Sequence, residues 1–307
     1  MDVIRGYDRV PAWSGSAVAI GNFDGVHVGH RALIQRTREL AGDAGRAVVL
    51  TFDPHPAAVV GSVAPPRLAS LDRRIELLAQ AGVDAVVIEP FTRELAGRSA
   101  DAFIDDIVVR ALRAHAIVVG YDFSYGHARA GTTATLCAHG ARAGITVQIV
   151  PAVDVDGLVA SSSKIRTLLR AGELESAAAL LGRSWDVDGV VVHGAKRGRA
   201  IGVPTANIAA TSDLPIAPGI YAVTLELAGE RDAMPAVASL GTNPTFVDGD
   251  TLSLEVHVLD WTGDLYGRTV RTSFVARLRD ELKFDSVDAL IAQIRRDIDQ
   301  ARRVLRS

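Results

Sequence analysis

The first half of the chain alternates short aliphatic, β-branched runs with longer stretches of helical periodicity. Strand-like runs occupy residues 16–20, 46–52, 84–89, 115–120 and 145–150. The stretches between them carry apolar residues three and four positions apart, and three of them end at glycine, a common helix stop. Alternation on this scale predicts βαβ units. We therefore expect an α/β domain built on a parallel sheet with helices on both faces.

The alternation stops near residues 180–189. Strand-like stretches with turn signals follow at 188–193, 219–227, 235–241, 252–260 and 268–278. Short strands at such spacing predict an antiparallel barrel or sandwich. A closing helix over 286–305 has an apolar stripe, which we expect to pack against the barrel. The stripe consists of Val287, Leu290, Ile291, Ile294, Ile298 and Leu305. The chain thus divides into two predicted domains, 1–182 and 183–307.

The net charge and the cysteine content limit the classes of partner and the compartment expected for this chain. The 307 residues carry a net charge of −3, so no global field indicates nucleic acid or an anionic membrane as a partner. Cys137 is the single cysteine, which excludes an intramolecular disulfide and fits a reducing compartment. The N-terminus has neither signal nor transit character, and no run approaches the roughly 20 apolar residues that span a bilayer. We expect a soluble, cytoplasmic protein.

The segment GNFDGVHVGH, residues 21–30, begins directly after the first strand-like run, residues 16–20. Loops at the carboxyl ends of parallel strands are where such sheets bind ligands. Gly21 and Gly25 allow backbone to approach a phosphate, and a helix beginning near Gly29 would direct its amides there. His27 and His30 would face the same spot as hydrogen-bond donors. The pattern predicts a phosphate site.

Zinc is the alternative for a histidine pair, but no third ligand is evident nearby, and zinc sites usually need three or four. A purely structural loop is a further alternative. The chain contains neither a P-loop nor the dinucleotide fingerprint, so nucleotide would have to be bound by another device. The H-x-G-H pattern at 27–30 resembles the signature of the HIGH-type nucleotidyltransferases, which have a Rossmann-like domain.

Further motifs extend the resemblance. TFDPHP, GYDFSYGHARAGT and SSSKIR follow in the first half, and RGRAIGVPTAN, GTNPTF, LEVHVLDWTGDLYG and FVARLRDELKF follow in the second. In this order they resemble the prokaryotic bifunctional riboflavin kinase/FMN adenylyltransferases, also called FAD synthetases, over nearly the whole chain. The resemblance implies riboflavin, FMN and ATP as substrates, FMN and FAD as products, and Mg²⁺ as the metal that accompanies ATP.

For the first half, the resemblance implies transfer of AMP from ATP to FMN. The nucleophile is a phosphate, already anionic, so the site must neutralise and align phosphates and needs no base. His27 and His30 would contact the α- and β-phosphates. Nucleotide binding is further implied for Asn22, Phe23, Asp24, Gly29, Ser161, Ser162 and Ser163, and Arg166 is placed among the catalytic residues. A cation early in a helix opposes the helix dipole, which favours an anion beside Arg166.

The flavin contacts implied for this half are less uniform. Asp53 and His55 in TFDPHP could bind flavin or could simply form a structural turn. Asp122 and Phe123 match a segment at the flavin side of the pocket, although some relatives carry Asn at position 122. Tyr125 is a mild departure from Phe.

For the second half, the resemblance implies phosphorylation of the riboflavin 5′-hydroxyl. The nucleophile is a neutral alcohol, so a base is useful, and Glu255 matches the base of the family. From the pattern alone, Glu255 is a solvent-facing strand residue that alternates with Leu254 and Val256. Thr205 and Asn207 would serve Mg²⁺, in keeping with its preference for oxygen ligands.

The glycine-rich basic stretch 193–202 would form a flap over the nucleotide phosphates, with Gly194, Lys196, Arg197 and Gly198 as the contacts. An exposed basic loop is the alternative. Arg277 and Arg279 match a segment near the flavin. Val203 and Asn243 depart from residues that many or some relatives carry, without removing an implied catalytic group.

Two other functions stay open from the sequence. One is a monofunctional relative in which one half has decayed, although the implied catalytic residues are present in both halves. The other is a non-catalytic flavin sensor, which would need a DNA-binding element that the sequence does not display.

Overall fold

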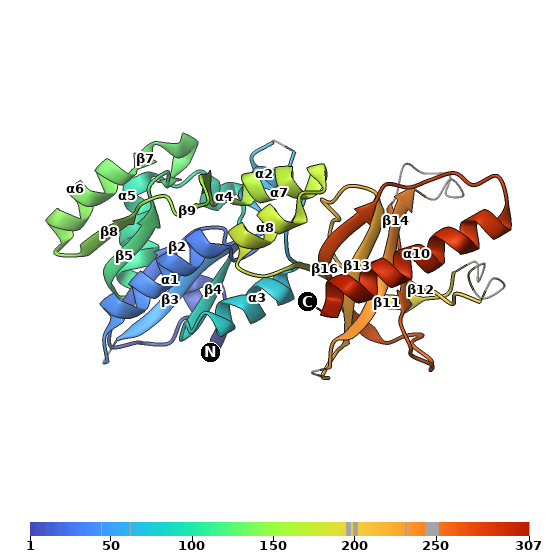
Figure 1. Cartoon of the computed structure of the whole chain (residues 1–307). Helices are drawn as coiled ribbons and strands as arrows, with labels where there is room; N and C mark the ends of the chain where they lie inside the picture. The colour runs from blue at the N-terminus through green and yellow to red at the C-terminus, as the bar shows by residue number, and fades with distance from the viewer. Residues whose placement is uncertain are drawn as a thin grey trace. The chain divides into compact units, whose positions relative to one another are not determined.

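The computed structural model describes residues 1–43, 45–61, 63–194, 198, 202–230, 232–242 and 252–306. Their contacts divide the chain into two compact units (Figure 1). The first unit contains Met1–Pro65 and Leu71–Ser161, and the second contains Pro66–Ser70 and Ser162–Ser307. The two units are described in turn.

The first unit is built on a six-stranded parallel sheet with the order β1-β4-β3-β2-β5-β8. Its strands are β1 (Asp2–Arg5), β2 (Ser16–Ile20), β3 (Arg46–Asp53), β4 (Ala85–Pro90), β5 (Ala114–Gly120) and β8 (Thr146–Val150). Starting from β2, the chain adds β3 and β4 on one side and β5 and β8 on the other. The order therefore reverses between β2 and β5, the topological switch point at which open sheets bind ligands.

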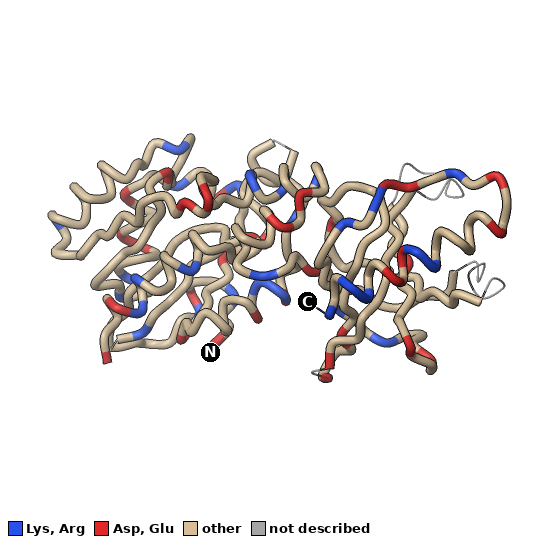
Figure 2. Tube along the Cα trace, in the orientation of Figure 1, with Lys and Arg blue, Asp and Glu red and all other residues tan. Residues whose placement is uncertain are grey.

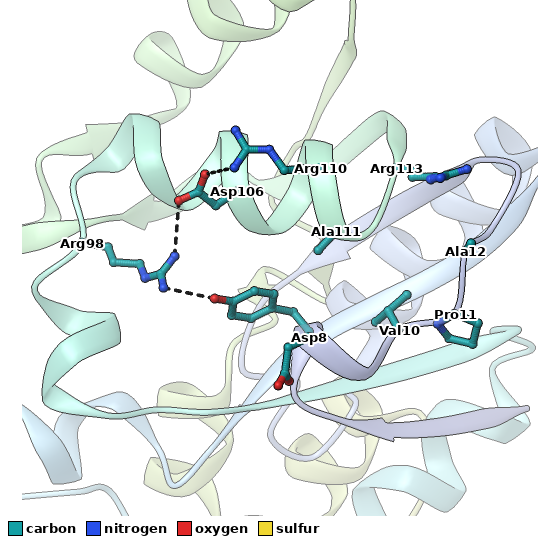
Figure 3. Close-up of a pocket in the computed structure, with 10 residues that line it drawn as sticks. Asp8, Val10, Pro11, Ala12, Arg98, Asp106, Arg110, Ala111 and Arg113 are labelled. Carbon is teal, nitrogen blue, oxygen red and sulfur yellow. Dashed lines mark hydrogen bonds and ion pairs between the residues drawn. The ribbon is translucent and has the colours of Figure 1, made fainter.

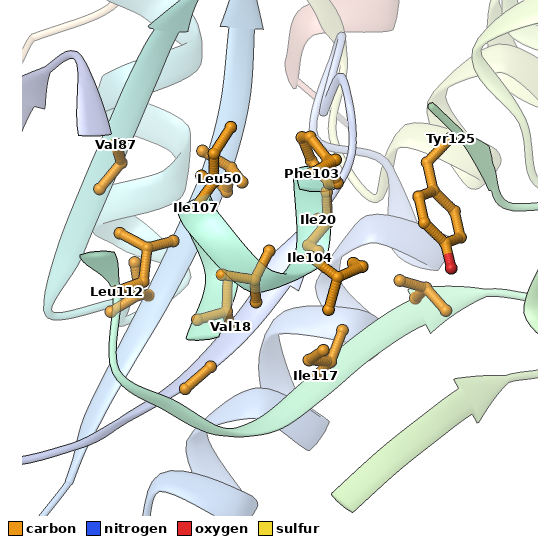
Figure 4. Packing of buried hydrophobic residues seen from close by; sticks show 14 of the residues in the cluster. Val18, Ile20, Leu50, Val87, Phe103, Ile104, Ile107, Leu112, Ile117 and Tyr125 are labelled. Atoms are coloured by element: carbon orange, nitrogen blue, oxygen red, sulfur yellow. The ribbon is translucent and has the colours of Figure 1, made fainter. Parts of the chain in front are cut away.

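Helices cover both faces of this sheet. On one face, Ile34 of α1 (Val28–Ala41) and Leu77 of α3 (Leu71–Gln80) pack on alternate residues of the strands. On the other, the π-helix η2 (Phe103–Ala111) and α6 (Thr133–Ala143) bury Ile104, Ile107 and Leu136 (Figure 4). Because the strands are covered on both sides, they read as continuous apolar runs.

Short elements complete the first unit. They are η1 (Tyr7–Arg9), α2 (Pro56–Val59), α4 (Arg93–Ala96), α5 (Ala100–Ala102), β6 (Ser124–Tyr125), η3 (His127–Arg129), β7 (Gly131–Thr132), β9 (Asp154–Val155) and β10 (Leu158–Val159). The pairs β6–β7 and β9–β10 form two-stranded antiparallel ribbons.

The second unit is a closed six-stranded antiparallel barrel with the order β11-β12-β15-β14-β13-β16. Its strands are β11 (Trp185–Val192), β12 (Ala206–Ala210), β13 (Gly219–Leu227), β14 (Met234–Thr242), β15 (Leu252–Val258) and β16 (Thr269–Arg279). Trp185, Tyr221 and Phe274 fill the interior, with ring centroids 5.1 and 5.3 Å from that of Phe274. The helix α10 (Val287–Arg306) packs against β13, β14 and β16.

Two helices that precede the barrel in the sequence, α7 (Ser162–Ala171) and α8 (Leu174–Leu181), belong to the second unit. They pack on each other, and α8 packs on β11 and β16. The segment Pro66–Ser70 joins the same unit, because the Trp185 indole donates to the Leu68 carbonyl at 2.9 Å. The division by contacts therefore falls after Ser161, whereas the predicted functional boundary lies after residue 182.

The predicted α/β sheet, barrel and closing helix are all present, so the predicted fold class is confirmed. Within the main sheet and the barrel, the patterns missed β1 and β12, of which β12 is needed to close the barrel; they also missed the short strands of the two ribbons. As expected, α10 packs on the barrel, and its apolar stripe is half-buried except at its first member, Val287, which is 60% exposed. The best-buried residues of this helix are Asp297 and Ala301.

Candidate functional sites

The loop after β2 has an unusual backbone. Phe23, Gly25 and Val26 have φ angles of 51°, 78° and 42°, a region that costs energy for residues other than glycine. The side chains of Phe23 and Val26 are fully buried in the cluster that includes Ile34 and Leu77. Burial of these two apolar side chains holds the loop in its strained shape, so its geometry is set before any ligand binds.

His27 and His30 lie at the end of this loop, where α1 begins. His27 caps the helix, because its Nδ1 accepts the backbone N–H of His30 at 3.3 Å. The two imidazoles stack with centroids 3.7 Å apart, and Phe23 lies 5.0 Å from His30. With Nδ1 occupied as an acceptor, the proton of a neutral His27 lies on Nε2, which is then a hydrogen-bond donor.

His30 is held as a neutral ring. Burial, the neighbouring His27 and the guanidinium of Arg74, in that order, lower the pKa of His30 well below its usual value. The residue as a whole is half-buried, and its Nδ1 is sealed from solvent without a hydrogen-bond partner among the described residues. A neutral imidazole in such a position can donate one hydrogen bond to an anionic oxygen.

The loop after β3 lies beside the loop after β2. His55 caps the short helix α2, because its Nδ1 accepts the N–H of Ala57 at 3.1 Å. Its Nε2 lies 3.3 Å from the side-chain amide of Asn22. The atom of Asn22 in this contact is the amide nitrogen Nδ2, so the contact joins the loop after β2 to the loop after β3.

Two side chains that the sequence patterns did not indicate join these loops. Thr51 Oγ1 donates to the Asn22 carbonyl at 3.1 Å, and Arg74 Nη1 donates to the same oxygen at 2.9 Å. Arg74 Nη2 also donates to the Phe52 carbonyl at 3.3 Å and lies 3.8 Å from Asp53 Oδ1. Arg74 lies on α3, outside every recognised motif, so only its burial identifies it.

The loop after β5, the neighbour of β2 on its other side, carries the predicted flavin contacts Asp122 and Phe123. Asp122 is exposed, and its carboxylate lies against the Cα of Gly120. Phe123 stacks on Tyr125 with centroids 5.4 Å apart and planes inclined by 15°. The loops after the adjacent strands β3, β2 and β5 thus place most of the predicted first-half residues at the same edge of the sheet. These residues are Asn22, Phe23, Asp24, His27, Gly29, His30, Asp53, His55, Asp122 and Phe123.

The remaining first-half residues lie near the division between the units. Ser161 ends the first unit, and Ser162, Ser163 and Arg166 belong to the first turn and a half of α7 in the second. The Arg166 side chain is buried, and its Nε donates to the Pro66 carbonyl at 2.6 Å. The role implied for these four residues stays a prediction.

On the barrel, a second group of predicted residues forms a row across neighbouring strands. Asn207 of β12 is paired in register with Glu255 of β15. Leu254 and Val256 are buried in the barrel interior, so Glu255 faces outward, as its alternation predicted. Thr205 Oγ1 donates to Glu255 Oε2 at 3.1 Å, which brings the predicted base and a predicted metal ligand together.

The backbone of the glycine-rich stretch approaches this row. A Cβ on Gly194 would collide with the Asn207 side-chain amide, and one on Gly198 would collide with the Val203 carbonyl and come to 3.4 Å from Thr205 Oγ1. Glycine is needed at both positions for this close approach. Lys196, Arg197 and Asn243 lie outside the described residues.

The patterns also missed His257, two residues after Glu255 on the same face of β15. Its Nδ1 lies 2.7 Å from the Pro204 carbonyl and therefore donates to it. This bond ties the strand to the Pro204–Thr205 turn. Nothing in the spacing distinguishes His257 from an ordinary outward-facing strand residue, so sequence reasoning had no signal for it.

The two predicted flavin-contacting arginines on β16 have protein partners. Arg277 Nη2 donates to the Pro218 carbonyl at 2.8 Å and to Asp280 at 2.5 Å. Arg279 donates hydrogen bonds from Nε and Nη2 to the carboxylate of Asp297 on α10, the shortest of them 2.7 Å long. In this structure Arg279 fastens α10 to the barrel, and a flavin contact of either arginine stays a prediction.

A cavity of about 530 Å³ lies elsewhere in the first unit, between the loop 7–12 and η2 (Figure 3). Its rim is tied together by Asp106, which pairs with Arg98 and Arg110, while Arg98 also donates to the Tyr7 hydroxyl at 3.0 Å. None of the motif residues lines this cavity. Acidic and basic residues are mixed along both units (Figure 2), in keeping with the small net charge.

Searches over the described residues gave two further results. No described helix is long and apolar enough to cross a membrane. No group of three or more His, Cys, Asp or Glu side chains is arranged there to hold a metal ion.

The two units match two families of transferases, one in each half of the chain. Residues 10–164 match the family model of FAD synthetase, and residues 181–305 match that of riboflavin kinase. The chain belongs to the family of bifunctional riboflavin kinase/FMN adenylyltransferases, and it produces FMN and FAD with ATP as the donor.

Curated relatives support this assignment over almost the full length. The chain is 39% identical to the bifunctional riboflavin kinase/FMN adenylyltransferase of Listeria monocytogenes, over 93% of this chain and 91% of the relative. It is 39% identical to that of Escherichia coli K12, over 97% and 96%. It is 38% identical to that of Pseudomonas fluorescens, over 98% and 97%.

One solved structure covers both units. A protein from Streptococcus pneumoniae, described as a macrolide-efflux protein, is 32% identical and has a TM-score of 0.88, covering 98% of this chain and 99% of its own. The likeness shows that the folds of both units are shared, while the family models and the curated relatives carry the assignment of activity.

Proposed function

We propose that adenylyl transfer occurs at the loops after β2, β3 and β5 of the first unit, and that riboflavin phosphorylation occurs at the Thr205–Asn207–Glu255 row of the barrel. The observation that carries the first assignment is the stacked pair His27 and His30 at the amino end of α1, beside the switch point of the sheet. The second rests on the direct hydrogen bond between Thr205 and Glu255.

In adenylyl transfer, an oxygen of the FMN phosphate attacks the α-phosphorus of ATP. The bond from that phosphorus to the oxygen bridging to the β-phosphate breaks, and pyrophosphate leaves. The phosphate nucleophile carries no proton that must be removed, so the site acts by alignment and by stabilising charge. The Nε2–H of His27 and a ring N–H of His30 would donate to the phosphates, together with the free amides at the start of α1 around Gly29.

The other first-half residues would complete substrate binding. Asn22, Phe23 and Asp24 would contact the nucleotide. Ser161, Ser162, Ser163 and Arg166 would hold the triphosphate, as the family resemblance implies. FMN would be bound by Asp53, His55, Asp122 and Phe123. The Phe123 ring stacks on Tyr125 through one face and would offer its other face to the flavin.

In riboflavin phosphorylation, Glu255 would remove the proton of the 5′-hydroxyl as its oxygen attacks the γ-phosphorus of ATP. The bond from the γ-phosphorus to the oxygen bridging to the β-phosphate breaks, and ADP leaves. The Thr205 hydroxyl orients the Glu255 carboxylate before substrate arrives. Gly194, Lys196, Arg197 and Gly198 would lie over the phosphates, and Arg277 and Arg279 would lie near the flavin.

Mg²⁺ fits the donor set of the barrel row. The hydroxyl of Thr205 and the side-chain oxygen of Asn207 are the hard ligands that this ion prefers, and Mg²⁺ is commonly held by one or two protein groups together with nucleotide phosphates. When bound, the ion would neutralise charge on the phosphate oxygens. We also propose the reducing cytoplasm as the place of both reactions, since ATP is the donor and the chain has one cysteine.

A chromatographic time course with riboflavin, ATP and Mg²⁺ tests the two assignments. The unmodified protein should form FMN and then FAD. His30→Ala should accumulate FMN, whereas Glu255→Ala should lose FMN formation and still convert supplied FMN to FAD. If either variant lost the other reaction instead, the assignment of the sites would be wrong.

The functional boundary is proposed at residues 182/183, supported by the riboflavin kinase match that begins at residue 181. Because α8 packs on β11 and β16, a kinase fragment beginning at 162 should be more stable than one beginning at 183. Thermal unfolding of the two fragments measures the difference. If both retain riboflavin phosphorylation, residues 162–182 support the barrel without taking part in its reaction.

A further inference from the structure

Arg74 is a buried cation at the edge of the sheet that carries the proposed adenylyl-transfer site. It belongs to the first turn of α3, and its side chain is 10% exposed. A buried guanidinium is costly unless its N–H groups are bonded and its charge is used. Its partners are therefore informative.

Arg74 donates hydrogen bonds to two different loops. Nη1 donates to the Asn22 carbonyl at 2.9 Å, in the loop after β2, and Nη2 donates to the Phe52 carbonyl at 3.3 Å, where β3 ends. Nη2 is also 3.8 Å from Asp53 Oδ1. The rigid fork of the guanidinium fixes the distance between these two backbone positions, as a single ammonium could not.

The same charge acts on His30. Burial first, then His27 and then Arg74 lower the pKa of His30 and so favour its neutral form. The carboxylate of Asp53 lies 3.8 Å from the Arg74 guanidinium. Arg74 is thus joined by hydrogen bonds to one side of the site and by electrostatics to the other.

We propose that Arg74 is a positioning residue for adenylyl transfer: its guanidinium holds the backbone at Asn22 and Phe52, and with it Asp53, at a fixed separation. The proposal rests on the placement of that reaction at these loops. It goes beyond it by assigning a role to a residue of α3 that lies in none of the motifs and that contacts the reacting groups only through other residues.

The test compares Arg74→Met with Arg74→Lys in the full-length protein. Arg74→Met removes both the fork and the charge, and misplacement of aligned groups by about 1 Å can cost on the order of 100-fold in rate. We expect kcat for FAD formation from FMN and ATP to fall about 10- to 100-fold, with a smaller change in KM for ATP. Arg74→Lys keeps the charge and one donor, so it should recover part of the lost rate.

A second measurement separates positioning from a general structural effect. In ¹⁵N-labelled protein, the ring nitrogens of His30, assigned with His30→Gln, report its protonation directly. The titration of His30 should move upward in pH in Arg74→Met and stay near that of the unmodified protein in Arg74→Lys. Riboflavin phosphorylation on the same chain should be unchanged in both variants.

Arg98→Met is the matched control. Arg98 is also a partly buried arginine of the first unit, and its side chain bonds Tyr7 and Asp106 and lines the cavity between the loop 7–12 and η2 (Figure 3). Arg98→Met should lower the melting temperature of the protein. It should change neither the titration of His30 nor kcat/KM for FAD formation.

The outcomes are distinct. The proposal is overturned if Arg74→Met keeps kcat within twofold of the unmodified protein, or if it behaves like Arg98→Met in rate, stability and His30 titration. If instead His27→Ala and His30→Ala both retain FAD formation, the placement of the reaction fails. If His27→Ala and His30→Ala lose FAD formation while Arg74→Met keeps it, the placement of the reaction stands and only the role of Arg74 is refuted.

Discussion

The two candidate sites are built by opposite means. In the first unit the residues lie on loops, and their geometry depends on buried side chains, such as Phe23 and Val26, that hold a strained backbone. On the barrel, Asn207 and Glu255 lie on regular strands, and strand register alone aligns them. Loop geometry is therefore sensitive to distant packing, whereas the barrel row depends mainly on its own side chains.

The largest effect should come from the barrel row. Glu255→Gln removes the proposed base while keeping size and a hydrogen-bond acceptor for Thr205, so riboflavin phosphorylation should fall by roughly 100- to 10,000-fold. Initial rates of FMN formation measure this. Glu226→Gln changes another outward glutamate of a barrel strand and should stay near the unmodified rate. Equal losses in both variants would contradict the role of Glu255.

A second prediction concerns the stability of the barrel unit. Asp297→Ala removes the buried partner of Arg279 and leaves a partly buried guanidinium uncompensated, which costs about 3 kcal/mol. Calorimetry should show a lower unfolding temperature, with riboflavin phosphorylation lost earlier on heating than FAD formation from FMN. An unchanged melting profile would mean that the Arg279–Asp297 pair does not fasten α10.

The loop site should respond to a single methyl group. A Cβ at Gly29 would come to 3.0 Å from the His27 ring, so Gly29→Ala should displace the histidine pair. We expect FAD formation to fall about tenfold, an effect of misplacement rather than of lost chemistry. The control is Gly97→Ala, which should leave the rate of FAD formation nearly unchanged. A Cβ at Gly97 would lie 3.4 and 3.5 Å from its nearest atoms. A similar loss in both would show that the effect is not specific to His27.

The smallest effect concerns Glu89 at the end of β4. Burial, its main cause, raises the pKa of Glu89, although the Tyr7 N–H donates to Oε2 at 2.8 Å. The folded state therefore favours the protonated carboxyl. Stability from this group is present below its unfolded pKa, near 4.3, and is lost as the pH rises through the folded pKa.

Glu89→Gln keeps an acceptor for Tyr7 and cannot ionise. It should raise the melting temperature slightly at pH 8 and have little effect at pH 4. Differential scanning at the two values measures this, and a larger gain at the lower pH would contradict the assigned direction.

Much of this architecture follows from local patterns. The runs of aliphatic residues predicted five parallel strands within one or two residues of their ends, because buried strands need continuous apolar sequence. Strands β1 and β12 escaped because Asp2–Arg5 and Ala206–Ala210 are short and of mixed polarity. Their pairing partners, far away in the sequence, decide their conformation.

The sequence by itself determined the fold class and, through several contiguous motifs in a fixed order, the family resemblance that implies the two reactions. The tertiary structure decided how those stretches meet. It ties Asn22 to Arg74 across 52 positions and Thr205 to Glu255 across 50, and it assigns α7 and α8 to the barrel unit. The physical reason is that hydrogen bonds and burial depend on distances in space, which residue spacing along the chain does not specify.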